Sequence, residues 1–284
     1  MGNAWKTSTL YPVWVLGASY QEGQDELVRR HAESFFRFTY RRNMPPLLPS
    51  QLTSDGGWGC MLRAAQMLMG HTLRLHLLGD DWRLPTRRRL WALASSAPYC
   101  DLVRWFSDHP DAPAEADAGS LDSPSQRHHY SLHAIAQMGL RYGKQPGEWC
   151  GPSTAAMVLR DLARLHCAGA GAGAKVDPTA QSDDTNGAFF DPLLRPPPGQ
   201  KPPWSSALLL LLPLRLGIHN VNVEYQEEIR EALQHPRCVG ILGGRPQHAI
   251  YFTGYRGEDD CTLLGLDPHT VFGNTALPPS PPTA

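Results

Sequence analysis

The segment from Cys60 to Leu78 constrains the fold more than any other part of this chain. It is rich in Leu, Met, Ala and Arg, all strong helix formers; Gly70 is its only interruption, and Gly79 is a typical helix stop. We therefore predict a long helix over residues 60–78 that lies at the centre of the fold and is mostly buried.

The sequence around this helix changes in character from the first half of the chain to the second. Helical patterns with capping or stop signals predict helices within residues 25–43, 87–96, 131–138 and 154–165. Short apolar runs predict strands at 11–17, 207–212, 239–242, 249–253 and 261–266, and residues 44–57 are expected to be a loop. Helices first and strands afterwards predict an α+β fold, with a helical first half packed on a mainly antiparallel sheet.

Two segments without folding signals define the expected domain organisation. Residues 168–203 begin with alternating Ala and Gly and end in a proline-rich stretch, so they are expected to be a loop-rich insertion. Residues 271–284 end in a run dominated by proline. We therefore expect one domain over residues 1–270 and a disordered tail over residues 271–284.

Charge and hydropathy argue against two classes of protein. The 26 basic and 27 acidic residues nearly cancel, so no surface for nucleic acid is indicated. The longest apolar run, residues 207–212, ends at Pro213 and is much shorter than the roughly 20 residues that a membrane-spanning helix needs. The first residues also lack the apolar core of a signal peptide, so a soluble protein is expected.

Cysteine and histidine spacing indicates neither a metal site nor a disulfide framework. The six cysteines are scattered and form no Cys-x-x-Cys pair. His128, His129 and His133 lack the glutamate that a zinc-binding helix carries between two histidines four residues apart. Reduced thiols in the cytoplasm are therefore expected, with no metal and no cofactor.

A glycine-rich loop leads directly into Cys60. The segment Gly56-Gly57-Trp58-Gly59 places the thiol at the first turn of the predicted helix, where free backbone N–H groups and the helix dipole stabilise a thiolate. The N–H of Cys60 could also stabilise an oxyanion on an attacked carbonyl. The alternative is that Cys60 is a small hydrophobic residue like any other buried cysteine.

An acid and an imidazole follow the last predicted strand. Asp267 and His269 are two residues apart, and Pro268 favours an extended backbone at Asp267. Side chains at i and i+2 of an extended chain point the same way, roughly 6.6 Å apart along the strand, so the carboxylate could orient the imidazole. The alternative is a turn in which Asp267 caps backbone groups and His269 is exposed.

Six segments in the same order resemble the autophagins, the autophagy-related cysteine proteases with a papain-like fold. The matching segments are Phe38–Arg41, Thr53–Arg63 apart from Gly56, Gly147–Ser153 apart from Cys150, Pro213–Gly217, Gly243–Pro246 and Leu266–His269. They span most of the chain from about Pro12 to Thr270. This resemblance implies that Cys60 is the nucleophile, His269 the general base and acid, and Asp267 the residue that orients His269.

The same resemblance implies roles for residues outside the triad. Tyr40 would help to form the oxyanion hole. Trp149 would cover the narrow channel for the C-terminal glycine of the substrate, and Pro246 would lie in the movable loop above it. Cys150 stands where the family usually has tyrosine, which removes no catalytic group. The family continues with further strand and helix sequence beyond the Asp-Pro-His motif, so this chain is expected to be a C-terminally truncated member.

The implied function is that of a thiol protease in autophagy with a Cys-His-Asp triad and no metal or cofactor. Family members trim a ubiquitin-like modifier after a C-terminal glycine and release it from phosphatidylethanolamine. The implied partners are therefore the modifier precursor and its lipid conjugate, with membrane contact only through the lipidated substrate. Two alternatives stay open: a catalytically impaired binder or regulator of the same modifier, and an adaptor that uses the Pro278–Pro282 tail.

Overall fold

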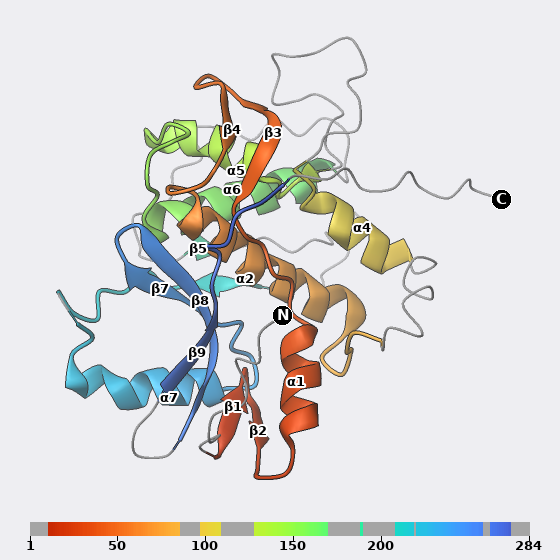
Figure 1. Cartoon of the computed structure of the whole chain (residues 1–284), viewed down its shortest axis with the longest axis vertical. Coiled ribbons are helices and arrows are strands. Elements are labelled where there is room, and N and C mark those ends of the chain that lie inside the picture. Colours follow the sequence, from red (N-terminus) through yellow and green to blue (C-terminus); the bar gives the residue numbers. More distant parts are fainter. Residues whose placement is uncertain are drawn as a thin grey trace, which may run out of the picture.

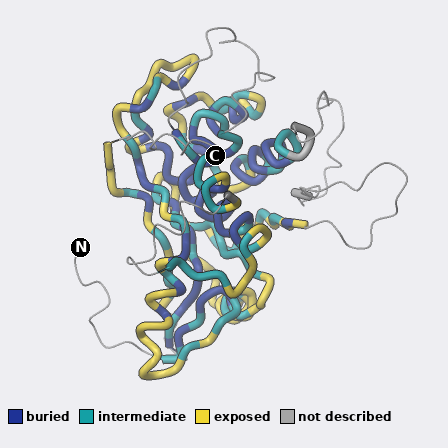
Figure 2. The backbone as a smooth tube through the Cα atoms, turned by 90° about the vertical axis from the view of Figure 1, so that its right-hand side faces the viewer, coloured by how far each residue is buried: buried dark blue, intermediate teal, exposed yellow. Residues whose placement is uncertain are grey.

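The computed structural model describes residues 11–85, 97–108, 128–169, 188–189, 208–218, 220–257 and 262–273. Helix α2 (Cys60–Leu78) runs through the middle, with other helices packed on one side and an antiparallel sheet on the other (Figure 1). Figure 2 shows buried residues along the interior and exposed residues at the periphery. The expected α+β fold class is confirmed.

Helix α2 has the bounds that its sequence predicts. It is capped by Gly59, and Gly79 ends it with φ +87°. Every residue from 60 to 69 is buried. Gly70 interrupts the helical pattern for a packing reason, because a Cβ at this position would lie 3.3 Å from the ring of Phe36. The prediction of a central, mostly buried helix is confirmed.

Three further helices pack against α2. They are α4 (Ala97–Trp105), α5 (Leu132–Gly139) and α6 (Pro152–Gly169). The predicted cap of α5 is present, since the Ser131 hydroxyl oxygen accepts the N–H of Ala134 at 3.1 Å. Helix α4 was not predicted, although Pro98 near its start is compatible with a first helical turn, which does not use the missing N–H. The helix predicted within residues 87–96 lies outside the described residues.

One antiparallel sheet faces α2. Its strands are β1 (Val13–Val15), β2 (Ala18–Tyr20), β7 (Ile241–Arg245), β8 (His248–Arg256) and β9 (Thr262–Leu266). Strand β8 is central: β1 and β7 pair with different parts of one edge, and β9 pairs with the other. The expectation of a mainly antiparallel sheet is confirmed, and the strands predicted after residue 238 are present with shifted ends.

A smaller second core lies on the part of the sheet away from α2. Helix α1 (Asp25–Glu33) contacts β1 and β2 there, and helix α7 (Gln226–Gln234) contacts β1 and β8. The buried side chains include Val28, Leu233 and Tyr255. This core includes β1 residues Val13 and Val15 and, near the end of β8, Tyr255.

Helix α1 ends at Glu33, ten residues before the predicted end near Asn43. The next aromatic residues pack into different cores: Phe35 belongs to the small core, whereas Phe36 packs against the main one. Successive side chains of an extended backbone point to opposite sides, so an extended segment lets these two rings enter different cores. Tertiary packing therefore overrides the local helical pattern.

A second small sheet replaces the loop expected over residues 44–57. It contains β3 (Arg41–Leu47), β4 (Leu52–Ser54) and β10 (Phe272–Gly273). The prolines of β3 are tolerated because the β3–β4 register is irregular between Arg42 and Leu47, where no regular ladder is formed. Strand β10 pairs in parallel with β3, so residues 272–273 form a strand in the segment expected to be a tail. Residues 274–284 lie outside the described residues.

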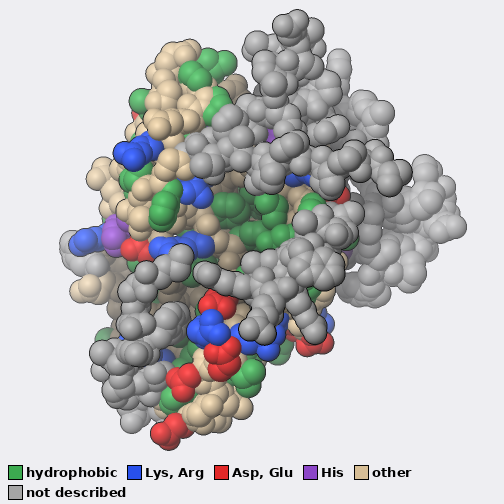
Figure 3. Space-filling view, turned by 45° about the vertical axis from the view of Figure 1, so that its right-hand side comes forward, with side chains coloured by type: hydrophobic (Ala, Val, Ile, Leu, Met, Phe, Trp, Pro, Cys, Tyr) green, Lys and Arg blue, Asp and Glu red, His purple; other side chains and the backbone are tan. Residues whose placement is uncertain are grey.

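The remaining elements are short. Strands β5 (Ala188–Phe189) and β6 (Leu210–Leu211) pair with each other, and 3-10 helices occupy Leu140–Tyr142 and Val223–Tyr225. The strand predicted over 207–212 is therefore reduced to two residues. Within the described ranges, no helix has both the length and the apolar character needed to span a bilayer. On the face shown in Figure 3, acidic and basic side chains are interspersed.

Candidate active site

Cys60 is the first residue of α2 and is fully buried. The loop before it packs closely: a Cβ on Gly59 would lie 2.5 Å from Oδ2 of Asp55, so only glycine fits there. The indole N–H of Trp58 donates to the carbonyl oxygen of Ser54 at 3.0 Å. The predicted position of the thiol at a helix N-terminus is therefore present, and the preceding loop holds it in place.

A buried ion network ties this loop to the helices. The Asp55 carboxylate accepts the backbone N–H of Arg41 at 2.7 Å and the Nε–H of Arg63 at 2.7 Å. Nη1 of Arg63 contacts Oδ2 of Asp108 at 2.6 Å, and Oδ1 of Asp108 accepts the N–H of Leu132 at 2.8 Å. Burial alone would lower the pKa of Arg63, but the carboxylates of Asp108 and Asp55 outweigh it and raise the pKa.

This network was not predicted as part of the site. Asp55 and Arg63 lie in a segment that matches the family, but no local pattern assigns them to a network, and none marks Asp108. The signal that could have revealed the network is Arg63 itself, because it lies in a helix that the sequence predicts to be mostly buried. A buried guanidinium requires carboxylate partners.

Asp267 and His269 follow β9 and contact each other as expected. Oδ1 of Asp267 accepts the backbone N–H of His269 at 2.9 Å and lies 2.5 Å from its Nδ1. Burial would raise the pKa of Asp267, but the hydrogen bonds and charge of His269 outweigh this effect and lower it. The capping alternative is also realised in part, since the same carboxylate accepts a backbone N–H and is 55% exposed.

Tyr40 lies between the two parts of the site. Its backbone N–H donates to the carbonyl of Pro268 at 3.0 Å, and its carbonyl accepts the N–H of Phe272 at 2.9 Å. Its ring meets the His269 ring edge-on, with centroids 5.5 Å apart. Burial and the neighbouring Cys60 raise the pKa of Tyr40. Cys60 and His269 therefore lie against the same tyrosine, although they are far apart in the sequence.

Two buried polar atoms at the centre have no hydrogen-bond partner among the described residues. They are Nε2 of His269 and the Tyr40 hydroxyl, and the hydroxyl lies beside the Cys60 thiol, which contributes to its raised pKa. Since Nδ1 of His269 is engaged by Asp267, Nε2 is the nitrogen available to a thiol. A thiol and an oriented imidazole that both lie against one tyrosine hydroxyl are the groups that acyl transfer through a covalent intermediate uses.

Trp149 and Cys150 lie on the approach to α6. Trp149 packs against the main core, close to Gly151, and its indole N–H has no partner in the described parts of the chain. Cys150 is buried, and burial raises its pKa to about 11, with a further contribution from Cys60. The residue that departs from the family pattern is therefore within electrostatic range of Cys60.

Pro246 lies in the turn between β7 and β8. Arg245 and His248 pair across this turn, and Gln247 adopts φ +63°. His248 stacks on His269, with ring centroids 4.2 Å apart and an angle of 19° between the planes. The turn that contains Pro246 therefore leads directly into His248, the residue that stacks on the His269 ring. His248 was missed because no local motif marks it.

The three histidines considered as metal ligands have different partners. His128 contacts the carbonyl of Arg104, His133 contacts the carbonyl of Pro45, and His129 stacks on His166. In the described parts of the chain, no group of three or more His, Cys, Asp or Glu side chains is placed to hold a metal ion.

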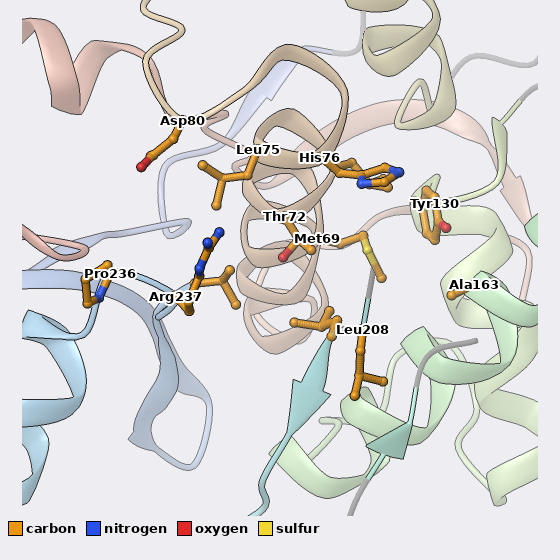
Figure 4. Close-up of a pocket in the computed structure, with 13 residues that line it drawn as sticks. Met69, Thr72, Leu75, His76, Asp80, Tyr130, Ala163, Leu208, Pro236 and Arg237 are labelled. Carbon is orange, nitrogen blue, oxygen red and sulfur yellow. The ribbon is translucent and has the colours of Figure 1, made fainter. Parts of the chain in front are cut away.

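A cavity of about 410 Å³ lies beside the C-terminal half of α2, away from these residues (Figure 4). Met69, Leu73 and His76 line it from α2, and Leu208 and Arg237 line it from the other side. The lining contains none of the residues predicted for the site, so the cavity is separate from Cys60, Tyr40 and His269.

Comparison with known proteins identifies a family. The sequence model of the peptidase C54 catalytic domain matches residues 25–276. The cysteine protease ATG4B of Xenopus laevis is 35% identical over 93% of this chain and 66% of its own length. ATG4D of Xenopus laevis is 31% identical over 91% of this chain and 60% of its own length. Human ATG4A is 32% identical over 91% of this chain and 64% of its own length. The chain thus spans between 60% and 66% of the length of these relatives.

Proposed function

The chain belongs to the peptidase C54 family, and from this membership we propose that it is a cysteine protease of the autophagy pathway. The family resemblance inferred from the sequence is thereby confirmed. One observation carries the proposal: Cys60 at the N-terminus of a buried helix and the Asp267–His269 pair both lie against Tyr40.

In the proposed reaction, Nε2 of His269 takes the thiol proton of Cys60, and the thiolate attacks the carbonyl carbon of the substrate amide. Asp267 keeps the proton on Nδ1 and stabilises the imidazolium. The backbone N–H of Cys60 and the hydroxyl of Tyr40 donate to the developing oxyanion. The imidazolium then protonates the leaving amine, which breaks the C–N bond and leaves a thioester on Cys60.

Hydrolysis of the thioester completes the cycle. Nε2 of His269 removes a proton from water, and the resulting hydroxide attacks the thioester carbon. The Cys60 thiolate leaves and recovers the proton from His269, so that acid and thiol are released in balance. The chemistry depends only on an acyl group joined to an amine, and it therefore applies equally to a peptide bond and to a lipid amide.

We propose as substrate the C-terminus of a ubiquitin-like autophagy modifier, cleaved after glycine, both in the precursor and in the conjugate with phosphatidylethanolamine. The burial of Cys60 supports this choice, because a thiol with so little exposed surface favours a substrate residue without a side chain. Movement of Trp149 or of the Pro246 turn would open the approach. Because Cys60, Cys150 and Cys238 are not in disulfide bonds, we place the protein in the reducing cytoplasm.

Incubation with a modifier that carries a C-terminal extension tests the proposal. Mass spectrometry should show cleavage after the glycine by the wild type and none by Cys60→Ala. Cys238→Ala is a matched control, because this thiol lies outside the site and should not affect cleavage. Equal cleavage by wild type and Cys60→Ala would refute the mechanism. Binding of the modifier without cleavage would instead support a catalytically impaired binder.

A further inference from the structure

His248 occupies a position fixed by the sheet. Strands β8 and β9 are antiparallel, with Leu266 opposite Tyr251. Continuing the same register three residues beyond the end of β9 brings His269 opposite His248. The ring centroids are 4.2 Å apart and the planes are within 19° of parallel, as expected for cross-strand neighbours on one face. The stacking therefore follows from strand pairing.

The start of β8, which carries His248, is also held by β7 and by the main core. His248 begins β8 and pairs with Arg245 across the turn formed by Pro246 and Gln247. The next residue, Ala249, is 1% exposed and belongs to the main core. Because the core holds Ala249, the direction of the His248 side chain is restricted.

We propose that His248 is a positioning residue for His269: when neutral it supports the ring orientation that pairs Nδ1 with Asp267, and when protonated it opposes the His269 imidazolium. The inference depends on the proposed function only in taking His269 as the base that forms an ion pair with Cys60.

Several charged or titratable groups face the two rings. Both rings lower the pKa of the Asp267 carboxyl group, His269 more strongly than His248. Arg245 lies opposite His248 on β7, and Tyr40, whose hydroxyl is beside Cys60, meets His269 edge-on. Two positive rings that share one carboxylate repel each other, so a second proton on the pair is disfavoured.

Catalysis requires a single positive ring, that of His269 beside the Cys60 thiolate. Histidine is the side chain whose charge ordinarily changes between about pH 5 and 8. A proton on His248 would put a second positive charge beside the His269 imidazolium and should therefore weaken its ion pair with Cys60. The loss of reactive thiolate on the acid side should then involve more than one proton.

The rate of Cys60 alkylation by iodoacetamide, measured against pH by mass spectrometry of the Cys60 peptide, tests this inference. His248→Phe keeps a ring against His269 and removes the charge, so its logarithmic rate should fall with a slope near one on the acid side. The wild-type rate should fall more steeply. His248→Ala should be about three- to tenfold slower near pH 7.5, the range expected for loss of an aromatic pair, and His248→Phe should restore most of that rate.

His76→Phe is the matched control, because His76 is an exposed histidine on the last turn of α2 and should leave the profile unchanged. Equal acid slopes for wild type and His248→Phe would overturn the inference, and so would a His248→Ala variant as fast as the wild type. Alkylation needs no modifier, so a reactive Cys60 without cleavage would count against the proposed function and not against the role of His248.

Discussion

The residues that hold Cys60 and those that hold His269 differ in burial and in the kind of contact. Cys60 begins a 19-residue helix, and Asp55 ties the preceding loop to Arg63, whose side chain is 1% exposed. Asp267 and His269 follow a five-residue strand, and the Asp267 side chain is 55% exposed. The nucleophile is thus supported by a buried ion network, whereas the base is supported by local hydrogen bonds and ring contacts.

This difference separates stability from activity. Breaking a buried ion pair leaves an uncompensated charge in the core, so changes beside Cys60 should lower the free energy of unfolding. Changes beside His269 leave no charge without a partner in the core. They should mainly affect the tautomer and orientation of the His269 imidazole. Three substitutions test whether the two regions behave in this way.

The largest effect is expected for Asp267→Asn. The amide cannot stabilise the His269 imidazolium or hold the correct tautomer, so kcat/KM for modifier cleavage should fall on the order of 10³–10⁴-fold. The free energy of unfolding, measured with urea, should change little because the side chain is largely exposed. Asp101→Asn, at an exposed acid on α4, is the matched control. Activity within tenfold of the wild type would contradict the assigned role.

Arg63→Met should produce the next largest effect, on the free energy of unfolding. Asp55 and Asp108 would each lose a buried partner, and removal of one member of such a network costs about 3–5 kcal/mol. Arg29→Met provides the control, because its pairs with Glu26 and Glu33 lie on the surface of α1. Similar urea midpoints for the two variants would show that the buried network stabilises the protein no more than surface pairs do. The proposed difference between the regions around Cys60 and His269 would then be lost.

Phe272→Pro should have the smallest effect of the three. It removes the N–H that donates to the Tyr40 carbonyl, and an unsatisfied carbonyl of this kind costs about 1–3 kcal/mol. The alkylation rate of Cys60 should fall with it, because Tyr40 contacts both parts of the site. Phe272→Ala keeps the N–H and loses only the ring beside Arg41, so it should be milder. An alanine variant as unstable as the proline variant would show that the ring matters more than the hydrogen bond.

Local patterns predicted the parts of the site that depend on near neighbours in the chain. The bounds of α2 followed from helix propensity and Gly79, and the contact between Asp267 and His269 followed from their spacing in an extended backbone. The loop expected over residues 44–57 was wrong, because β3 pairs with β4 within that segment, and β3 is held on its other edge at Arg41 and Arg42 by β10, more than two hundred residues away. No pattern around Arg41 indicates that partner.

The sequence by itself therefore determined a buried helix with Cys60 at its start, an Asp-Pro-His segment with two side chains in contact, and membership of a protease family. Interactions over one to four residues are sufficient for the first two. Only the tertiary structure decided that Arg63 binds Asp55 and Asp108, that Tyr40 lies between the two parts of the site, and that His248 stacks on His269. These contacts join residues that are distant in the chain, and they exist only once strand register and helix packing are set.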